Sequence, residues 1–198
     1  MRTYGYGRDT VPTEYQKYAI KIGSKVDLLS HVIVSRLFDA HGIGSKMATR
    51  KFLKWADEYN PDELWLHNIH GYYINYPMLF EWIKKRPNMK VKWTFHDCWA
   101  FTGHCSHFLE EECKKWESQC RKCPQKKEYP SSFIDQSKRN FKMKQKSFTY
   151  KESNFKRDIH VEGKLLILGG ASAWIRKKGL FDFLSLESYW MRLMQLCW

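Results

Sequence analysis

The sequence predicts an α/β fold in which a Rossmann-like parallel sheet is flanked by helices. Helical and strand-like segments alternate with short connections between about residues 24 and 95. Two strand-like segments run into a histidine, one at His67 and one at His96. Apolar residues make up 43% of the 198 residues, which is ample for a packed core.

Two amphipathic helices come first. Ser24 is placed to cap a helix that extends to about Phe38 and ends before Gly42. Its apolar residues form one stripe at helical spacing, namely Val26, Leu29, Ile33 and Leu37. Ser45 is placed to cap a second helix, whose apolar positions again recur at helical spacing: Ala48, Phe52, Trp55, Ala56 and Tyr59.

The alternation continues with a strand, a helix and a second strand. A break at residues 60–62 (NPD) precedes a short buried strand from Glu63 to His67. Asn75 begins the next helix, which tolerates Pro77 in its first turn and ends at residues 86–88 (RPN). The second strand runs through Val91, Trp93 and Phe95. This order is typical of one parallel α/β layer.

The chain divides into an amino-terminal domain, a linker and a fragment of a second domain. Residues 1–149 form the first domain, with a cysteine-rich loop at 97–132 and a basic helix near its end. Residues 150–163 are polar and unpatterned, as linkers are. Residues 164–198 begin with an apolar strand from Leu165 to Leu168 and continue to a helix near Lys178, which predicts a βα fragment of a second Rossmann-like domain.

The net charge of +13 indicates an anionic partner, which could be nucleic acid, acidic lipid headgroups or a phosphorylated substrate. Much of the excess lies in one basic segment: Lys138, Arg139, Lys142, Lys144, Lys146, Lys151, Lys156 and Arg157. A solvated helix face followed by a linker is the alternative explanation for these residues.

No membrane-spanning or secretory segment is predicted. No apolar run approaches the ~18 residues that a spanning helix requires. The first residues, MRTYGYGR, lack the apolar centre of a signal peptide. We therefore expect a cytoplasmic protein whose contact with a membrane would be peripheral, on the inner face of the cell membrane.

Polar residues at the ends of the predicted strands are the candidates for catalysis and substrate binding. Ligands of parallel sheets bind beyond the carboxyl ends of the strands, so His67 and His96 should line one cleft. His96 is the candidate catalytic residue, and Asp97 beside it would orient the ring or bind a sugar hydroxyl. A histidine that caps the next turn is the alternative role for His96. The candidate substrate-binding residues are His67, Asn68, His70 and Gly71.

Four cysteines lie close together in the loop at 97–132. They are Cys105, Cys113, Cys120 and Cys123, the last two spaced as C-x-x-C. Four thiolates close a tetrahedral zinc site, and zinc would order a loop with little core of its own. Such a zinc would be structural, because four thiolates leave no open position for catalysis. Unpaired thiols in a packed loop are the alternative, and His104 or His107 could replace one thiolate.

A glycine-containing segment after the last predicted strand is a candidate phosphate site. Gly169 and Gly170 follow the strand, and Arg176, Lys178 and Gly179 precede a helix. Backbone amides, a helix amino terminus and lysines would converge there on an anion. The segment lacks the G-x-G-x-x-G and P-loop signatures.

Several segments together resemble bacterial family 4 glycosyltransferases of the exopolysaccharide and colanic-acid type. The matching segments are HGIGS at 41–45, LHNIHGYYIN at 66–75 and WTFHDCWAFTGHC at 93–105, followed by the spaced residues Cys113, Trp116, Cys120, Cys123, Tyr129, Pro130, Asp135 and Lys138. The resemblance covers roughly residues 20 to 148, and a weaker match resumes between Leu165 and Leu186.

The resemblance implies a GT-B fold, in which two Rossmann-like domains face each other across a cleft. It implies transfer of a sugar from a nucleotide-sugar donor to a lipid-linked or glycan acceptor, with retention of configuration and without a catalytic metal. His96 matches the histidine near the reacting sugar on the amino-terminal, acceptor side. Lys178 and Gly179 match the lysine and glycine at the donor phosphates, where the lysine would stabilise the leaving pyrophosphate.

The chain departs from the family pattern in ways that predict a truncated and internally deleted enzyme. By the family pattern, its first residues are expected to follow the family's first strand and Gly-rich loop. Only a short polar stretch separates Phe148 from Lys164. Ala173 stands near the position where the family has an arginine, a few residues before the phosphate lysine. The two glutamates that bind the donor's sugar and ribose late in the family's sequence are absent. Because half of the donor pocket is missing, we expect little or no transferase activity from this chain alone.

A different class of function is also compatible with the composition. A zinc-ordered basic domain could bind nucleic acid or another polyanion through phosphate contacts and stacked aromatic side chains. No known nucleic-acid-binding motif is present, and this alternative does not explain histidines at strand ends. The sequence therefore favours glycosyl transfer, with nucleic acid as an unlikely partner.

Overall fold

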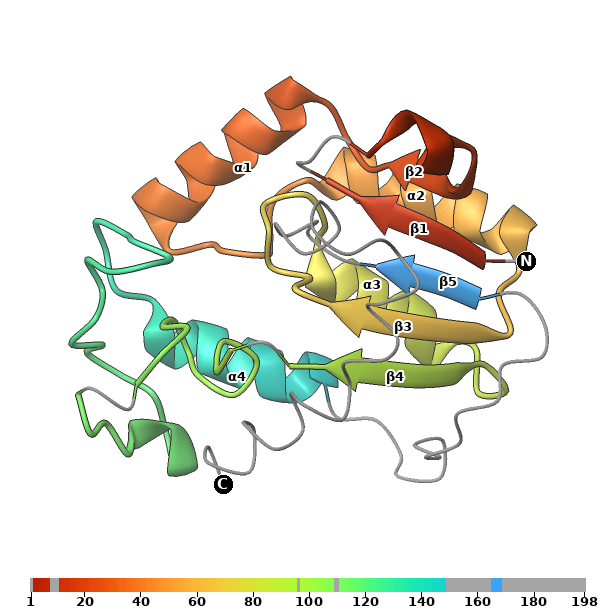
Figure 1. Ribbon diagram of the computed structural model, residues 1–198. Coiled ribbons are helices and arrows are strands. Elements are labelled where there is room, and N and C mark those ends of the chain that lie inside the picture. Colours follow the sequence, from red (N-terminus) through yellow and green to blue (C-terminus); the bar gives the residue numbers. More distant parts are fainter. Residues whose placement is uncertain (1, 8–10, 96, 109–110, 149–164, 169–198) are drawn as a thin grey trace.

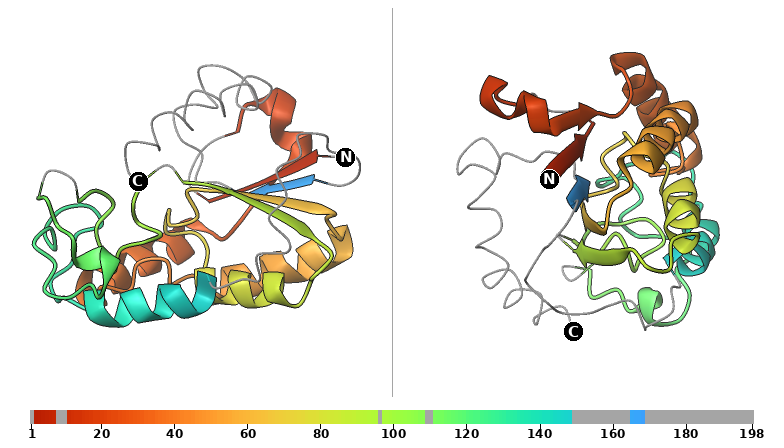
Figure 2. Two further views of the ribbon diagram at one scale, coloured as in Figure 1. Left: turned by 90° about the horizontal axis from the view of Figure 1, so that it is seen from below. Right: turned by 90° about the vertical axis from the view of Figure 1, so that its right-hand side faces the viewer.

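The computed structural model describes residues 2–7, 11–95, 97–108, 111–148 and 165–168. These residues form a single five-stranded sheet in the order β2-β1-β5-β3-β4, and every neighbouring pair of strands is parallel (Figure 1). Helices α2, α3 and α4 lie on one face of this sheet (Figure 2). The predicted α/β class with a parallel sheet and flanking helices is confirmed.

The sheet includes a strand at the amino terminus that the sequence pattern does not predict. β1 (Arg2–Tyr6) pairs with β2 (Ala19–Lys21) on one side and with β5 on the other, and the 3₁₀ helix η1 (Thr13–Tyr18) connects β1 to β2. The described sheet thus includes a strand ahead of the first predicted helix. Gly5 obscures the strand pattern, yet it allows close packing: a Cβ at Gly5 would lie 2.7 Å from Leu168 Cδ2.

β5 (Leu165–Leu168) lies in the same sheet as the amino-terminal strands. The sequence assigns them to a fragment of a second domain, whereas the structure inserts them between β1 and β3 in the same sheet. Leu166 and Leu168 are fully buried there, and each contributes roughly 2 kcal/mol of hydrophobic stabilisation. An apolar run of four residues suits any buried strand position, so its partners are not readable from its own sequence. The predicted linker at 150–163 and the helix near Lys178 lie outside the described residues.

β3 (Glu63–His67) and β4 (Lys90–Thr94) form the part of the sheet that carries the candidate site. All five residues of β3 are buried, as predicted. The two strands run in register, with Glu63 opposite Lys90 and His67 opposite Thr94. Their carboxyl ends therefore lie side by side at one edge of the sheet, where ligands of parallel sheets bind.

α2 (Lys46–Tyr59) and α3 (Tyr76–Lys84) confirm the predicted helices and supply much of the core. Phe52 and Ala56 of α2 are buried, as are Leu79 and Ile83 of α3. The Asn75 Oδ1 atom accepts a hydrogen bond from the Met78 amide at 3.1 Å, which caps α3 as predicted.

Ser45 precedes α2 but does not cap it. Its backbone is left-handed (φ 51°), and its side chain makes no hydrogen bond to the first turn of the helix. The Ser45 hydroxyl instead lies 2.8 Å from His31 Nδ1 and 3.3 Å from the Tyr72 carbonyl oxygen. The Ser45 hydroxyl is therefore engaged in tertiary contacts, although the local pattern predicts that it caps the helix.

α1 (Lys25–Phe38) begins at Ser24 as predicted, but its apolar stripe is exposed. The Ser24 hydroxyl accepts from the Asp27 amide and the Asp27 carboxylate accepts from the Ser24 amide, which completes a capping box. The exposed stripe consists of Val26, Leu29, Ile33 and Leu37. The buried residues of α1 are His31 and Ser35, so helical periodicity alone identified the wrong buried face.

α4 (Ser137–Phe148) confirms the predicted basic helix and packs against α3. The irregular cysteine-rich segment before it contains the short 3₁₀ helix η2 (Lys115–Glu117). Across the described parts of the chain, none of the helices combines the length and apolar character needed to span a bilayer.

Candidate functional site

A small pocket opens at the carboxyl edge of the sheet, where β3 and β4 end. It is lined by residues that follow these two strands: Asn68, Ile69, His70, Trp93, Thr94, Phe95, Asp97, Trp99 and Ala100. Three of the predicted site residues therefore meet in one pocket, namely Asn68, His70 and Asp97. Asn68 has a left-handed backbone (φ 37°), which turns the chain sharply after β3.

His70 and Asp97 form the polar centre of this pocket. The His70 Nε2 atom lies 3.0 Å from Asp97 Oδ2, and both side chains are largely buried. The other carboxylate oxygen, Asp97 Oδ1, accepts a hydrogen bond from the Trp99 amide at 2.9 Å. Burial raises the pKa of Asp97 above its ordinary value. A carboxylate held in this way orients the imidazole beside it, which is the arrangement used by general acids and bases.

The other predicted residues of the site occupy different positions. His67 is the last residue of β3 and is buried, with 6% of its surface exposed. Gly71 follows His70 in the same bend. His96, Lys178 and Gly179 lie outside the described residues. Of the two histidines at positions 67 and 70, the structure places His70 in the pocket lining.

A buried cluster of aromatic and imidazole rings supports the pocket from behind. The His41 ring centroid lies 5.5 Å from that of His70 and 5.6 Å from that of Trp99. Burial lowers the pKa of His41 well below its ordinary value, so its ring is neutral at physiological pH. Neither ring nitrogen of His41 has a hydrogen-bond partner among the residues that the structure describes.

Lys144 lies in this buried layer and corrects the interpretation of the basic segment. Its Nζ atom donates to the carbonyl oxygens of Trp99, at 2.6 Å, and Thr102, at 3.0 Å. It also lies 3.6 Å from the Trp99 ring centroid, a cation–π contact. Burial lowers the pKa of Lys144 to about 7. Lys144 is therefore an internal group and does not belong to a solvated or anion-binding face.

The helical spacing of α4 could have revealed the burial of Lys144. Ser137, Asn140, Phe141 and Lys144 follow one another at intervals of three, one and three residues, and all four are buried. These positions form one stripe of a helix. Lysine at the end of such a stripe is an uncommon core residue, which is why charge counting grouped it with its exposed neighbours.

A second buried pair joins the cysteine-rich loop to the ends of α1 and α4. His104 Nδ1 lies 2.6 Å from Asp39 Oδ1, and the other carboxylate oxygen of Asp39 accepts from the Gln136 amide at 2.7 Å. The Asn140 side chain donates to the Asp39 carbonyl oxygen. Sequence reasoning missed Asp39, because nothing in its local pattern distinguishes it from an ordinary residue after a helix.

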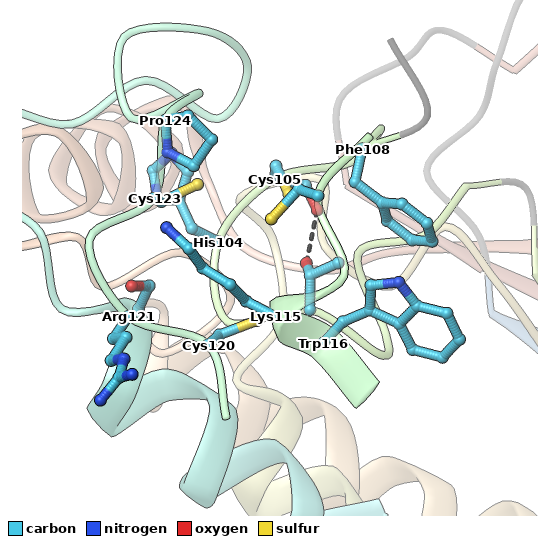
Figure 3. A pocket seen from close by; sticks show the side chains of 12 residues that line it. His104, Cys105, Phe108, Lys115, Trp116, Cys120, Arg121, Cys123 and Pro124 are labelled. Atoms are coloured by element: carbon cyan, nitrogen blue, oxygen red, sulfur yellow. Dashed lines mark hydrogen bonds between the residues drawn. The ribbon is translucent and has the colours of Figure 1, made fainter. Parts of the chain in front are cut away.

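The four cysteines of the loop line one pocket together with His104, Phe108 and Trp116 (Figure 3). Cys105 and Cys120 are buried, and Cys113 and Cys123 are partly exposed. A hydrogen bond from Cys123 lowers the pKa of Cys105, and the same bond together with burial raises the pKa of Cys123. Within the described ranges, no three His, Cys, Asp or Glu side chains are already arranged to hold a metal ion.

A basic hollow lies beyond the carboxyl end of α1. Its lining consists of Arg36, Lys126, Lys127, Ser131, Ser132 and Phe133. One of its lining residues, Phe133, is an apolar side chain that is 71% exposed. Basic and apolar groups thus share one surface.

Comparison with known proteins relates the chain to glycosyltransferases. It is 28% identical over 142 residues to a protein of Escherichia coli (strain K12) provisionally named colanic acid biosynthesis glycosyl transferase WcaC. The match covers 68% of this chain and 34% of the relative, so the chain spans about a third of that protein's length. No family model and no solved structure matches the chain. The similarity supports a glycosyltransferase relationship and gives no support to the nucleic-acid-binding alternative.

Proposed function

We propose that this chain contributes the acceptor-side half of a glycosyltransferase of polysaccharide biosynthesis. In this proposal a sugar is transferred, with retention of configuration, from a nucleotide-sugar donor to a lipid-linked or oligosaccharide acceptor. The described sheet is the amino-terminal Rossmann-like domain of a GT-B fold. Support comes from the parallel sheet, from the motif resemblance between residues 41 and 138, and from the related colanic acid transferase.

The observation that carries the proposal is the His70–Asp97 pair in a pocket at the carboxyl edge of β3 and β4. The carboxylate fixes the imidazole, and Asn68 adds an amide to the same lining. An imidazole, a carboxylate and an amide offer the donors and acceptors that bind sugar hydroxyls. Trp93, which is partly exposed, provides a flat apolar surface in the same lining, against which the face of a sugar ring can pack.

The roles of His96, Lys178 and Gly179 follow from the family resemblance. His96 is the proposed catalytic histidine, one residue before Asp97 and therefore close to the pocket in sequence. Lys178 and Gly179 are the proposed donor-phosphate residues, with the lysine neutralising charge on the leaving pyrophosphate. No catalytic metal is part of the proposed reaction.

A panel of ligands tests the proposal with the full chain. Saturation-transfer NMR would compare UDP-, GDP- and dTDP-sugars with short exopolysaccharide fragments. We expect binding of at least one sugar ligand, its loss in His70→Ala, and its retention in the surface control Lys54→Glu. Binding is the chosen readout because turnover depends on donor-side residues of which this chain contains few. Absence of binding across the whole panel would contradict the proposal.

An anionic membrane surface is the proposed environment of the acceptor. The apolar stripe of α1 is exposed along its length, from Val26 at 77% to Leu37 at 44%. The basic hollow with Arg36, Lys126 and Lys127 adjoins the end of this stripe. The apolar stripe of α1 would insert between the lipid headgroups and acyl chains, while the basic groups contact headgroup phosphates, as in peripheral membrane proteins. A lipid-linked acceptor would then be presented at the same surface.

A further inference from the structure

The pocket in the cysteine-rich loop gathers thiols from separated positions of the chain. Cys105 follows His104, Cys113 precedes η2, and Cys120 and Cys123 follow it. Figure 3 shows Cys105, Cys120 and Cys123 around one pocket, and Cys113 belongs to the same lining. The thiols of Cys105 and Cys123 already share a hydrogen bond, and those of Cys113 and Cys120 are close enough to act on them electrostatically. The backbone therefore directs four soft ligands to one place.

An independent observation at this pocket points to a ligand. His104 is 2% exposed and its Nδ1 atom is engaged by Asp39, while its Nε2 atom is buried without a hydrogen-bond partner in the described part of the chain. His104 also lines the cysteine pocket. Buried polar atoms in native proteins are nearly always satisfied, so an unsatisfied ring nitrogen beside four thiols indicates a missing group.

The loop around the pocket has a small apolar cluster of its own. Among the described residues, the buried members of this cluster are Cys98, Cys105 and Phe108, with Phe101 and Trp116 packed at its edge. Between Asp97 and Gln136, the described residues contain η2 as their regular element. Loops of this kind are commonly ordered by a metal, because the free energy of metal binding is also folding free energy.

The charges around the pocket suit a zinc–thiolate centre. Zn²⁺ bound to four thiolates carries a net charge of about −2, which needs compensation in a partly buried site. Lys115 and Arg121 line the pocket. The buried side chain of Lys144 acts electrostatically on Cys120. Cationic groups therefore surround the position at which negative charge would form.

We propose that this pocket is a structural zinc site in which Cys105, Cys113, Cys120 and Cys123 are the ligands. The thiols do not yet form a coordination shell, so zinc binding requires their side chains to turn toward a common point. Binding converts four thiols to thiolates, forms four Zn–S bonds and releases four protons to solvent. The Cys105–Cys123 hydrogen bond is replaced by two bonds to the metal.

His104 acts in this proposal as a positioning residue. Asp39 holds Nδ1 of the ring, and a hydrogen on Nε2 would donate to a metal-bound sulfur, which can only accept. Outer partners of this kind orient the groups around a metal and tune its affinity. Because Asp39 contacts both His104 and the Gln136 amide, it also connects the cysteine-rich loop to the end of α1 and to the start of α4.

Metal analysis of the full chain tests the proposal. The protein would be purified without chelators from medium that contains zinc, and its metal content measured by mass spectrometry. We expect about one zinc per chain, and loss of that zinc in Cys105→Ser and Cys123→Ser. Cys98→Ala is the matched control, because Cys98 is buried in the same loop but does not line the pocket. Less than about half an equivalent in the unmodified chain would overturn the proposal.

Cobalt substitution identifies the ligands without depending on activity. Co²⁺ in place of zinc should give the absorption bands of a tetrahedral four-thiolate site in the unmodified chain. His104→Ala should keep these bands and release the metal to a chelator more rapidly. A spectrum that changes to fewer ligands in His104→Ala would overturn the four-cysteine assignment. A Cys105–Cys123 disulfide in the protein as purified, detected by mass spectrometry, would overturn the metal site itself.

Discussion

His104 and Asp39 are 65 positions apart in the sequence, yet their side chains meet at 2.6 Å and are each only 1% exposed. Asp39 ends α1, and its carboxylate also accepts from the Gln136 amide just before α4. One buried carboxylate therefore joins three parts of the chain: the end of α1, the cysteine-rich loop and the start of α4. Polar groups in such a position are costly to leave unpaired.

Replacing Asp39 should destabilise the whole domain. Asp39→Ala leaves the His104 ring and the Gln136 amide without their acceptor, and we expect the free energy of unfolding to fall by about 3 kcal/mol. Urea denaturation followed by circular dichroism measures this change. Glu58→Ala, on the exposed surface of α2, is the control and should change stability by less than about 0.5 kcal/mol. An Asp39 variant as stable as this control would show that the pair is not a structural connection.

The buried ammonium of Lys144 predicts a specific pH dependence of stability. Its pKa is about 7 in the folded chain and near 10.5 when unfolded, so the unfolded chain binds more protons between these values. Its cost to stability is complete below about pH 7 and diminishes as the pH rises toward 10.5. The unfolding free energy of the unmodified chain should therefore rise relative to that of Lys144→Met over this window. Denaturant titrations of both proteins at several pH values measure the difference, and a constant difference would contradict the lowered pKa.

The Asp97 carboxylate should fix the tautomer of His70. Because Asp97 accepts from Nε2, the neutral ring should carry its proton on that nitrogen. Nitrogen-15 NMR of the His70 ring reports the tautomer directly. Asp97→Asn should shift the tautomer and weaken sugar binding roughly tenfold, which corresponds to the loss of about one good hydrogen bond. An unchanged His70 spectrum in Asp97→Asn would show that the pair does not form in solution.

The exposed stripe of α1 and the basic hollow should bind anionic membranes together. Cosedimentation would compare vesicles that contain phosphatidylglycerol with vesicles of phosphatidylcholine alone. We expect binding to the anionic vesicles, with a decrease of about tenfold in Lys127→Glu, since each basic group near such a surface contributes about 1 kcal/mol. The double variant Leu29→Ser, Ile33→Ser should weaken binding as well.

Lys54→Glu is the matched control for the vesicle experiment. It makes the same change of net charge as Lys127→Glu, but on α2, away from the hollow. Equal losses in the two charge variants would indicate a general effect of net charge. Equal binding of the unmodified chain to both kinds of vesicle would contradict an anionic partner.

Local signals in the sequence identified most elements but could not assign their faces or partners. The cap at Asn75 and the break at residues 60–62 are short-range features, so α3 and β3 could be predicted. The burial of His31 depends on amides of Gly42 and Gly44, which both donate to its Nε2 atom at 3.1 Å. Contacts of this kind connect residues 11 and 13 positions apart, beyond the reach of helical periodicity.

Sequence reasoning pointed to residues that line the candidate pocket, but not to the buried layer behind them. The rule that ligands bind beyond parallel strands pointed to Asn68, His70 and Asp97, which the structure brings together in one pocket lining. The buried layer with His41 and Lys144 was not foreseen, because it depends on the packing of α4 against the loop after β4. Asp39 was missed for the same reason, since its partners lie 65 and 97 positions further along the chain.

Locating the bound sugar tests the central claim most directly. The isotope-labelled full chain would be titrated with the nucleotide sugar or glycan that binds, and shift changes mapped by NMR. The proposed function predicts that the largest changes fall on Asn68, His70 and Asp97, and that His70→Ala abolishes them. Changes confined to residues outside this pocket, or none with any sugar, would contradict a glycosyl-transfer site at the carboxyl edge of β3 and β4.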